Sequence, residues 1–261
     1  MALELRPAAA FSLDELAALF NAGYQDYFLP FRIDPLSLRA MNDAFDVDAD
    51  ASRVALRDGE PVGLANLALR GAEAWVGGVG VVPDARRGGV GEALMRALHE
   101  EARARGVMTI WLEVIEQNEA AARLYDKLGY EVVREVEVWT LPADETGGSA
   151  TEVDAHDAHE HVRRVRTWRE PWQRADATLA HYDDLRGLAT RGGGGAAVFR
   201  LGSALPLLQI AGSDLEVLLR AMRTRAPVSA LNVPADDPLT DALRALGASA
   251  VVRQREMSLS L

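Results

Sequence analysis

One short stretch of the sequence joins an apolar segment to an amphipathic one: Pro83-Asp84-Ala85-Arg86-Arg87-Gly88-Gly89-Val90-Gly91-Glu92-Ala93-Leu94-Met95. A strand that ends at Pro83, turns through glycines and enters a helix leaves backbone N–H groups unpaired at the positive end of the helix dipole. Glycines at 88, 89 and 91 let the backbone wrap a bulky group, while Arg86 and Arg87 add donors and charge. The stretch therefore predicts an anion site with phosphate as the natural ligand. The alternative is a glycine-rich turn with solvated arginines.

The segments around this loop predict a mixed α/β domain. Apolar spacing, caps and turns indicate a helix over 11–22, strands over 52–56, 61–69 and 75–82, a helix over 91–105, a strand over 108–115, a helix over 119–128 and a strand over 131–141. Ser12 and Glu15 have capping-box spacing, and Asp58-Gly59 is typical of a hairpin turn. Glycines at 77, 78 and 80 inside a strand predict a bulge or a close approach of a ligand to the backbone.

Composition limits the classes of function. The 261 residues are 49% apolar and include no cysteine, which excludes disulfides, thiolate metal sites and cysteine nucleophiles. Asp and Glu outnumber Lys and Arg by 39 to 28, a net charge of −11, so a nucleic-acid partner is not expected. Neither a membrane span nor a signal peptide is indicated, and we expect a cytoplasmic protein. The His-rich tract over 154–161 has no partner cluster elsewhere, so no metal site is expected.

Two motifs resemble signatures of one family. The segment over 79–91 resembles the acetyl-CoA signature of the GNAT N-acetyltransferases, Arg/Gln-x-x-Gly-x-Gly/Ala, whose core is here Arg86, Gly89 and Gly91. The segment over 118–130, NEAAARLYDKLGY, is similar to the family's Asn-x-x-Ala-x-x-Leu-Tyr-x-x-Leu-Gly-Phe. The two motifs stand in the family's order, and the resemblance covers residues 1 to about 142.

The resemblance implies site residues. The donor acetyl-CoA would be held by Val79, Val81, Arg86, Arg87, Gly88, Gly89, Gly91 and Asn118, with the valines acting through their backbone. Tyr125 matches the family's acid for the departing thiolate, although a packing role in its helix is the alternative. Asn118 also suits a helix cap. Glu113 is the predicted general base because a charged residue inside an apolar strand is costly without a role or a partner, and Glu73 and Asp26 are further candidates. The alternative for each of the three is an ordinary paired or solvated carboxylate.

The second half of the chain repeats the order of the first. The stretch over 142–161 reads as a linker, so we expect domains over 1–145 and 146–261, with a tandem GNAT fold of two mixed sheets flanked by helices. At the position of the phosphate loop the second half has Ile210-Ala211-Gly212-Ser213-Asp214, with no arginine and an acid that would repel phosphate. Leu243 stands where the first half has Tyr125. We therefore predict a degenerate second copy.

Together these observations predict an acetyl-CoA-dependent N-acetyltransferase. The resemblance implies that a primary amine attacks the thioester directly in a ternary complex. The acceptor is a small-molecule or peptide amine, with residues 23–39 helping to form its pocket, and the protein is expected to be a monomer or homodimer. The alternative from another class is a CoA-binding sensor or scaffold without turnover.

Overall fold

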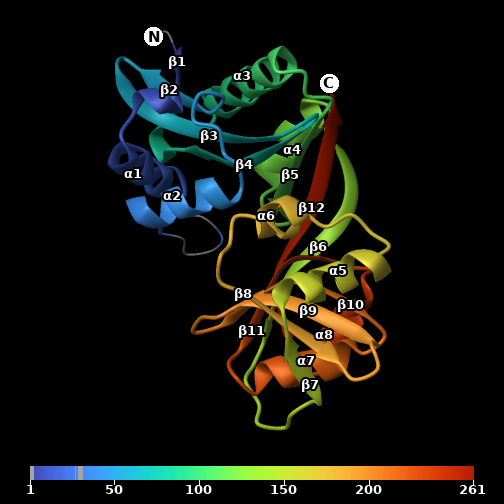
Figure 1. Ribbon diagram of the computed structural model, residues 1–261. Coiled ribbons are helices and arrows are strands. Elements are labelled where there is room, and N and C mark those ends of the chain that lie inside the picture. Colours follow the sequence, from blue (N-terminus) through green and yellow to red (C-terminus); the bar gives the residue numbers. More distant parts are fainter. Residues whose placement is uncertain (1–2, 27, 29–31) are drawn as a thin grey trace. The chain divides into compact units, whose positions relative to one another are not determined.

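The computed structural model describes residues 3–26, 28 and 32–261, and its internal contacts divide the chain into two units (Figure 1). The first unit comprises Met1–Val133 together with Glu256–Leu261, and the second comprises Arg134–Arg255. This division differs from the boundary near residue 145 that the sequence predicts. The sequence boundary was placed where the apolar periodicity ends, which is the end of the strand β6 (Glu131–Leu141). The division by contacts falls inside this strand, because its residues after Val133 pack with the second unit.

The first unit has a mixed sheet with helices on both faces, which confirms the predicted fold class. Its elements are β1 (Leu3–Pro7), η1 (Ala8–Ala10), α1 (Leu13–Gly23), α2 (Pro35–Ala44), β2 (Arg53–Arg57), β3 (Glu60–Arg70), β4 (Glu73–Val81), η2 (Pro83–Ala85), α3 (Val90–Ala104), β5 (Thr109–Ile115) and α4 (Glu119–Lys127). The strand order is β1-β2-β3-β4-β5, antiparallel up to β4 and parallel between β4 and β5. The sequence did not predict β1 or α2.

Residues of the sheet alternate between two apolar clusters. Val54 and Leu56 of β2 pack with the cluster of α1 and α2, while Ala55 packs with the cluster of α3 and α4. Figure 1 shows α1 and α2 on one face of this sheet and α3 on the other. The capping box that starts α1 is present, because the Ser12 hydroxyl accepts from the Glu15 N–H and Glu15 accepts from the Ser12 N–H.

The last residues of the chain complete the first unit. Met257 is part of the α3 and α4 cluster, and Leu259 and Leu261 pack against it. The N–H of Leu261 donates to the carbonyl of Met108 at 2.9 Å, next to the start of β5. The core of the first unit therefore depends on the chain's C-terminal strand.

The second unit has the same alternation of strands and helices. Its elements are β7 (Ala150–Val153), α5 (Ala155–Val165), η3 (Trp172–Arg174), α6 (Asp176–Leu179), β8 (Leu185–Thr190), β9 (Gly195–Arg200), β10 (Leu205–Gly212), α7 (Leu215–Arg223), β11 (Val228–Pro234), α8 (Pro238–Ala245) and β12 (Ser249–Ser260). The strand order is β6-β11-β10-β9-β8-β7, with β10 and β11 parallel. The predicted linker is wrong for its second part, because the His-rich tract lies in α5, whose first turn is capped by Asp154. The acidic, His-rich composition of this tract led to the linker prediction, although the tract is helical.

Candidate active site

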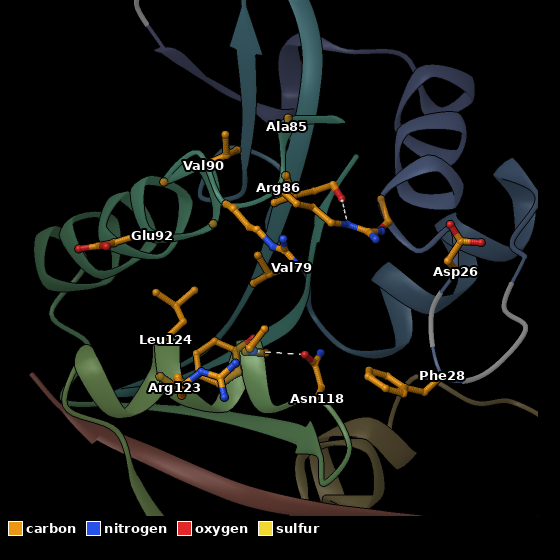
Figure 2. A pocket seen from close by; sticks show the side chains of 18 residues that line it. Asp26, Phe28, Val79, Ala85, Arg86, Val90, Glu92, Asn118, Arg123 and Leu124 are labelled. Carbon is orange, nitrogen blue, oxygen red and sulfur yellow. Dashed lines mark hydrogen bonds between the residues drawn. The ribbon is translucent and has the colours of Figure 1, made fainter. Parts of the chain in front are cut away.

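A cavity of about 650 Å³ lies in the first unit (Figure 2). It is lined by Gly23, Asp26, Phe28, Val79, Val81, Ala85, Arg86, Arg87, Gly89, Val90, Gly91, Glu92, Asn118, Ala120, Ala121, Arg123, Leu124 and Tyr125. The cavity thus brings together eight of the ten residues that the sequence predicts for the site, and the other two, Gly88 and Glu113, are outside its lining. Of the predicted acceptor segment over 23–39, Gly23, Asp26 and Phe28 line the cavity, while residues 27 and 29–31 are outside the described part of the chain.

Two neighbouring strands separate beside this cavity. The parallel pairing of β4 with β5 covers Glu73–Trp75 and Thr109–Trp111, and beyond it the two strands continue without pairing to each other. On its other side β4 is antiparallel to β3, where the Val82 N–H donates to Val62 O at 3.0 Å. Because hydrogen-bonded pairs alternate in an antiparallel ladder, Val79 and Val81 direct their N–H and C=O groups away from β3 and into the gap. These are the two valines predicted to act through their backbone.

A bulge precedes these two valines. The register of β3 with β4 shifts between Asn66 and Leu67, which leaves Gly77 as the extra residue, and Gly78 has a φ of 152°. A Cβ on Gly78 would lie 2.6 Å from the Tyr24 hydroxyl, so only glycine fits there. The predicted bulge is confirmed, and the group that approaches Gly78 closely is the side chain of Tyr24.

The loop that leads into α3 leaves backbone donors open. Arg87 and Gly89 have φ angles of 62° and 76°, and Gly89 caps α3 without a side chain. The first helical hydrogen bond runs from Ala93 N–H to Gly89 O at 3.0 Å, so the N–H groups of residues 90–92 have no partner within the helix. Residues 89–92 all line the cavity, and the positive end of the helix dipole is directed toward it.

The two arginines of the loop have different environments. Arg86 donates through Nε to Val81 O at 3.0 Å and through Nη2 to Gly23 O at 3.2 Å and Gln25 O at 2.8 Å (Figure 2). Its guanidinium therefore fastens the end of α1 to the end of β4. Arg87 forms neither a hydrogen bond nor an ion pair with any residue that the structure describes. Arg87 is thus the loop arginine whose charge is available to a ligand, a distinction that sequence spacing could not make.

The acidic residue of the first α3 turn is neutralised by its neighbours. Glu92 accepts from Lys127 Nζ at 2.6 Å and from Arg96 Nη2 at 2.9 Å. These two hydrogen bonds, Lys127 first, lower the pKa of the Glu92 carboxyl. Figure 2 shows Glu92 pointing away from Arg86 and Val79, so this carboxylate does not oppose an anion at the loop.

Helix α4 presents Asn118 and Tyr125 to the cavity. Asn118 Oδ1 accepts from the Ala121 N–H at 3.2 Å, which confirms the cap, and its side chain also lines the cavity. Tyr125 is only 7% exposed and its ring packs on Tyr130 with 5.7 Å between centroids, so packing and access to the cavity coexist. Ala120, Ala121, Arg123 and Leu124 of α4 line the cavity as well. Of these, helical spacing from Asn118 and Tyr125 could have identified Ala121.

A buried histidine of α3 contacts Tyr130, which follows α4. His99 Nε2 lies 3.0 Å from the Tyr130 hydroxyl, and both side chains are buried. Burial lowers the pKa of His99 to about 4, with smaller contributions from Arg103 and Arg96. His99 is therefore neutral at pH 7, and burial likewise raises the pKa of the Tyr130 phenol.

The three candidate bases lie in different places. Glu113 Oε2 accepts from Trp75 Nε1 at 2.8 Å, and Glu73 Oε1 accepts from Trp111 Nε1 at 2.9 Å. Each carboxylate thus binds a tryptophan of the neighbouring strand, and the two tryptophans form the last pair between β4 and β5. Glu113, the charged residue in the apolar strand, thus has a tryptophan as its hydrogen-bond partner. Asp26 lines the cavity, and Figure 2 shows it with Phe28 on the side away from Glu92.

The corresponding gap in the second unit is occupied by its own chain. Pairing of β10 with β11 covers Leu205–Leu207 and Val228–Ala230. Beyond it, Arg174 Nε donates to Leu208 O at 2.8 Å and Gln209 Nε2 donates to Arg174 O at 2.7 Å. Arg174 is 1% exposed and pairs with Glu170 at 3.1 Å.

Comparison with known proteins identifies the first unit. Residues 14–130 match the sequence profile of the Acetyltransferase (GNAT) family. These residues are a GNAT acetyltransferase domain. The [Ribosomal protein bS18]-alanine N-acetyltransferases of Escherichia coli K12 and Salmonella typhimurium LT2 are 47% and 45% identical to the chain over 58 residues, which is 22% of this chain and 39% of theirs. The match thus spans well under half of the length of these relatives.

Solved structures extend the likeness in fold to both units. A GCN5-related N-acetyltransferase from Sphaerobacter thermophilus has a TM-score of 0.69 and 16% identity, covering 99% of this chain and 95% of its own. A tandem GNAT protein from the clavulanic acid biosynthesis pathway has a TM-score of 0.63 and 18% identity, covering 99% and 98%. The tandem GNAT fold is confirmed. Among the described residues, no helix is long and apolar enough to cross a membrane and no group of three or more acidic or histidine side chains could hold a metal.

Proposed function

We propose that the protein is an acetyl-CoA-dependent N-acetyltransferase that transfers the acetyl group to a primary amine in a ternary complex. The observation that carries this proposal is the cavity of the first unit. It combines the outward backbone groups of Val79 and Val81, an uncapped helix start with a free Arg87, and the hydroxyl-bearing Tyr125. This combination of groups suits an anionic, thioester-bearing donor.

Each group has a role in the transfer. The N–H groups at the start of α3 and Arg87 bind the pyrophosphate, and the backbone of Val79 and Val81 binds the pantetheine arm and polarises the thioester carbonyl. The amine nitrogen attacks the carbonyl carbon and the C–S bond breaks. Tyr125 gives its proton to the departing thiolate, and the new amide nitrogen loses a proton to a base.

We propose that the base is one of two carboxylates. Asp26 is open to the cavity and can accept the proton directly, whereas Glu113, the base predicted from sequence, is held by the Trp75 indole and would act through water. Replacing either residue by its amide keeps the shape and removes the basic group. The base is the one whose replacement removes the acidic limb of the pH profile of kcat/KM.

A peptide or protein α-amine is the acceptor class that we propose first. The relatives in Escherichia coli and Salmonella are named for an alanine of a ribosomal protein, which favours an N-terminal amine over a lysine or a small amine. The experiment is incubation with acetyl-CoA and a panel of an N-terminal alanine peptide, its N-blocked lysine-containing counterpart and small amines, with thiol release and product mass as readouts. Tight CoA binding without thiol release for any amine would favour the sensor or scaffold instead.

A further inference from the structure

Arg57, at the end of β2, reaches the phosphate loop from a part of the chain that no motif covers. Arg53, Ala55 and Arg57 alternate with Val54 and Leu56, and the latter two pack toward α1 and α2. Ala55 packs with the α3 cluster, and Arg53 forms an ion pair with Glu101 of α3. Arg57 therefore lies on the α3 face of the sheet.

Strand and helix run in opposite directions on this face. From Glu101 back to Gly89, α3 spans about 18 Å at the usual helical rise. From Arg53 to Arg57, β2 advances about 13 Å at the usual strand rise, and the arginine side chain covers the remainder. The guanidinium is accordingly close to the loop, since Arg57 Nη2 lies 2.9 Å from the position that a Cβ of Gly88 would occupy.

The charge of Arg57 is not paired with an acidic side chain among the described residues. Arg53, four residues earlier on the same face, is paired with Glu101. The Arg57 guanidinium has neither a hydrogen bond nor an ion pair with any residue in the described ranges, although Asp58 and Glu60 are close in sequence. Gly88, the residue it contacts, is outside the cavity lining, whereas Arg87 and Gly89 on either side of it line the cavity. Arg57 thus places a free guanidinium against the outer side of the loop.

We propose that Arg57 binds the 3′-phosphate on the nucleotide end of the donor. This inference rests on the proposed function and follows from the order of groups along CoA. With the thioester beside Tyr125 and the pyrophosphate at the start of α3, the nucleotide continues past the loop and out of the cavity. The group it carries there is one further phosphate, and a guanidinium binds phosphate through charge-assisted hydrogen bonds.

The test compares CoA with dephospho-CoA, which lacks only that phosphate. Calorimetric Kd values for both ligands are measured with the wild type, Arg57→Ala and Arg191→Ala. Arg191 is an exposed arginine of the second unit, so its removal changes the net charge equally without touching the loop. We expect the wild type to prefer CoA by about tenfold, as one charge-assisted contact warrants. Arg57→Ala should abolish that preference and leave the Kd of dephospho-CoA unchanged, while Arg191→Ala keeps it.

Each outcome decides the proposal. An equal loss of affinity for both ligands in Arg57→Ala would place the contact at the pyrophosphate and overturn the assignment, as would an unchanged preference in a variant with wild-type melting temperature. If Arg191→Ala also lost the preference for CoA over dephospho-CoA, the preference would depend on net charge alone, and the assignment would be overturned. A wild type that binds neither ligand contradicts the proposed donor itself, which is a separate result.

Discussion

Met257 links the C-terminus of the chain to the stability of the GNAT domain. Its side chain is 1% exposed in the cluster that also contains Tyr125 and Tyr130. Truncating a buried methionine to alanine costs about 2–5 kcal/mol, from lost transfer free energy and the remaining cavity. Domains of this kind have a free energy of unfolding of about 5–15 kcal/mol. Met257→Ala should therefore remove a large part of the stability of the first unit.

Removing the last six residues should have a larger effect. Glu256–Leu261 contribute Met257, two partly buried leucines and the hydrogen bond from Leu261 N–H to Met108 O. Each well-buried apolar side chain contributes about 1.5–3 kcal/mol and each hydrogen bond about 1 kcal/mol, so the deletion approaches the whole stability of the unit. A fragment that ends near residue 145 lacks the same strand and should fail to fold for the same reason.

Hydrogen exchange read by mass spectrometry can separate the two units. In Met257→Ala, amides of β5 and α4 should exchange faster while those of β9 and α7 keep their protection. The control is Val251→Ala, in the same strand at a side chain that is 53% exposed, where the expected change is within about 0.5 kcal/mol. Unchanged protection of β5 and α4 in Met257→Ala, or CoA binding at full affinity after deletion of the last six residues, would refute the reasoning.

Four further results are expected. Tyr125→Phe should lower kcat by roughly 10²- to 10⁴-fold with little change in CoA affinity, since only the proton is lost; intact turnover contradicts its role. Arg87→Ala should weaken CoA binding at an unchanged melting temperature, whereas Arg86→Ala should lower the melting temperature too, because its three carbonyl contacts are structural. With a folded pKa of about 4 against 6.5 unfolded, His99 contributes stability above pH 6.5 that is lost as the pH falls toward 4, so melting temperatures of His99→Gln should depend less on pH there. Calorimetry should find one CoA per chain, and two would show that the second unit also binds it.

Features of the site that depend on local backbone geometry could be predicted from sequence. Asp58 and Gly59 have φ angles of 54° and 86°, as the predicted hairpin turn requires. Gly89 has open space around its Cβ position and a φ of 76°, so its backbone conformation alone demands glycine. The capping box of α1 was likewise predictable, because Ser12 and Glu15 form its hydrogen bonds with each other. In each case the residues that cause the structure are within a few positions of one another.

Features that depend on distant residues could not be predicted in this way. Arg86 and Arg87 are adjacent and identical in type, and only the carbonyls of Gly23 and Gln25, some sixty positions earlier, separate their roles. The hydrogen bond that Glu113 accepts from the Trp75 indole, 38 positions earlier, could not be predicted from sequence, and the role of Glu113 as the base stays a prediction. The assignment of the last six residues to the first unit depends on contacts with segments more than a hundred positions earlier, beyond the reach of periodicity or composition.

The strand gap of the second unit is filled by the protein's own side chains. The register of β10 with β9 shifts between Leu207 and Gln209, so this strand bulges beside its gap as β4 does. The carbonyl that the bulge releases, that of Leu208, accepts from the protein's own Arg174. Burial raises the pKa of the Glu170 carboxyl, which pairs with the Arg174 guanidinium. Removing either member of this buried pair would leave the other charge without a partner. The gap of the second unit has therefore become part of its core, whereas in the first unit Val79 and Val81 line a cavity and the Val81 carbonyl accepts from Arg86.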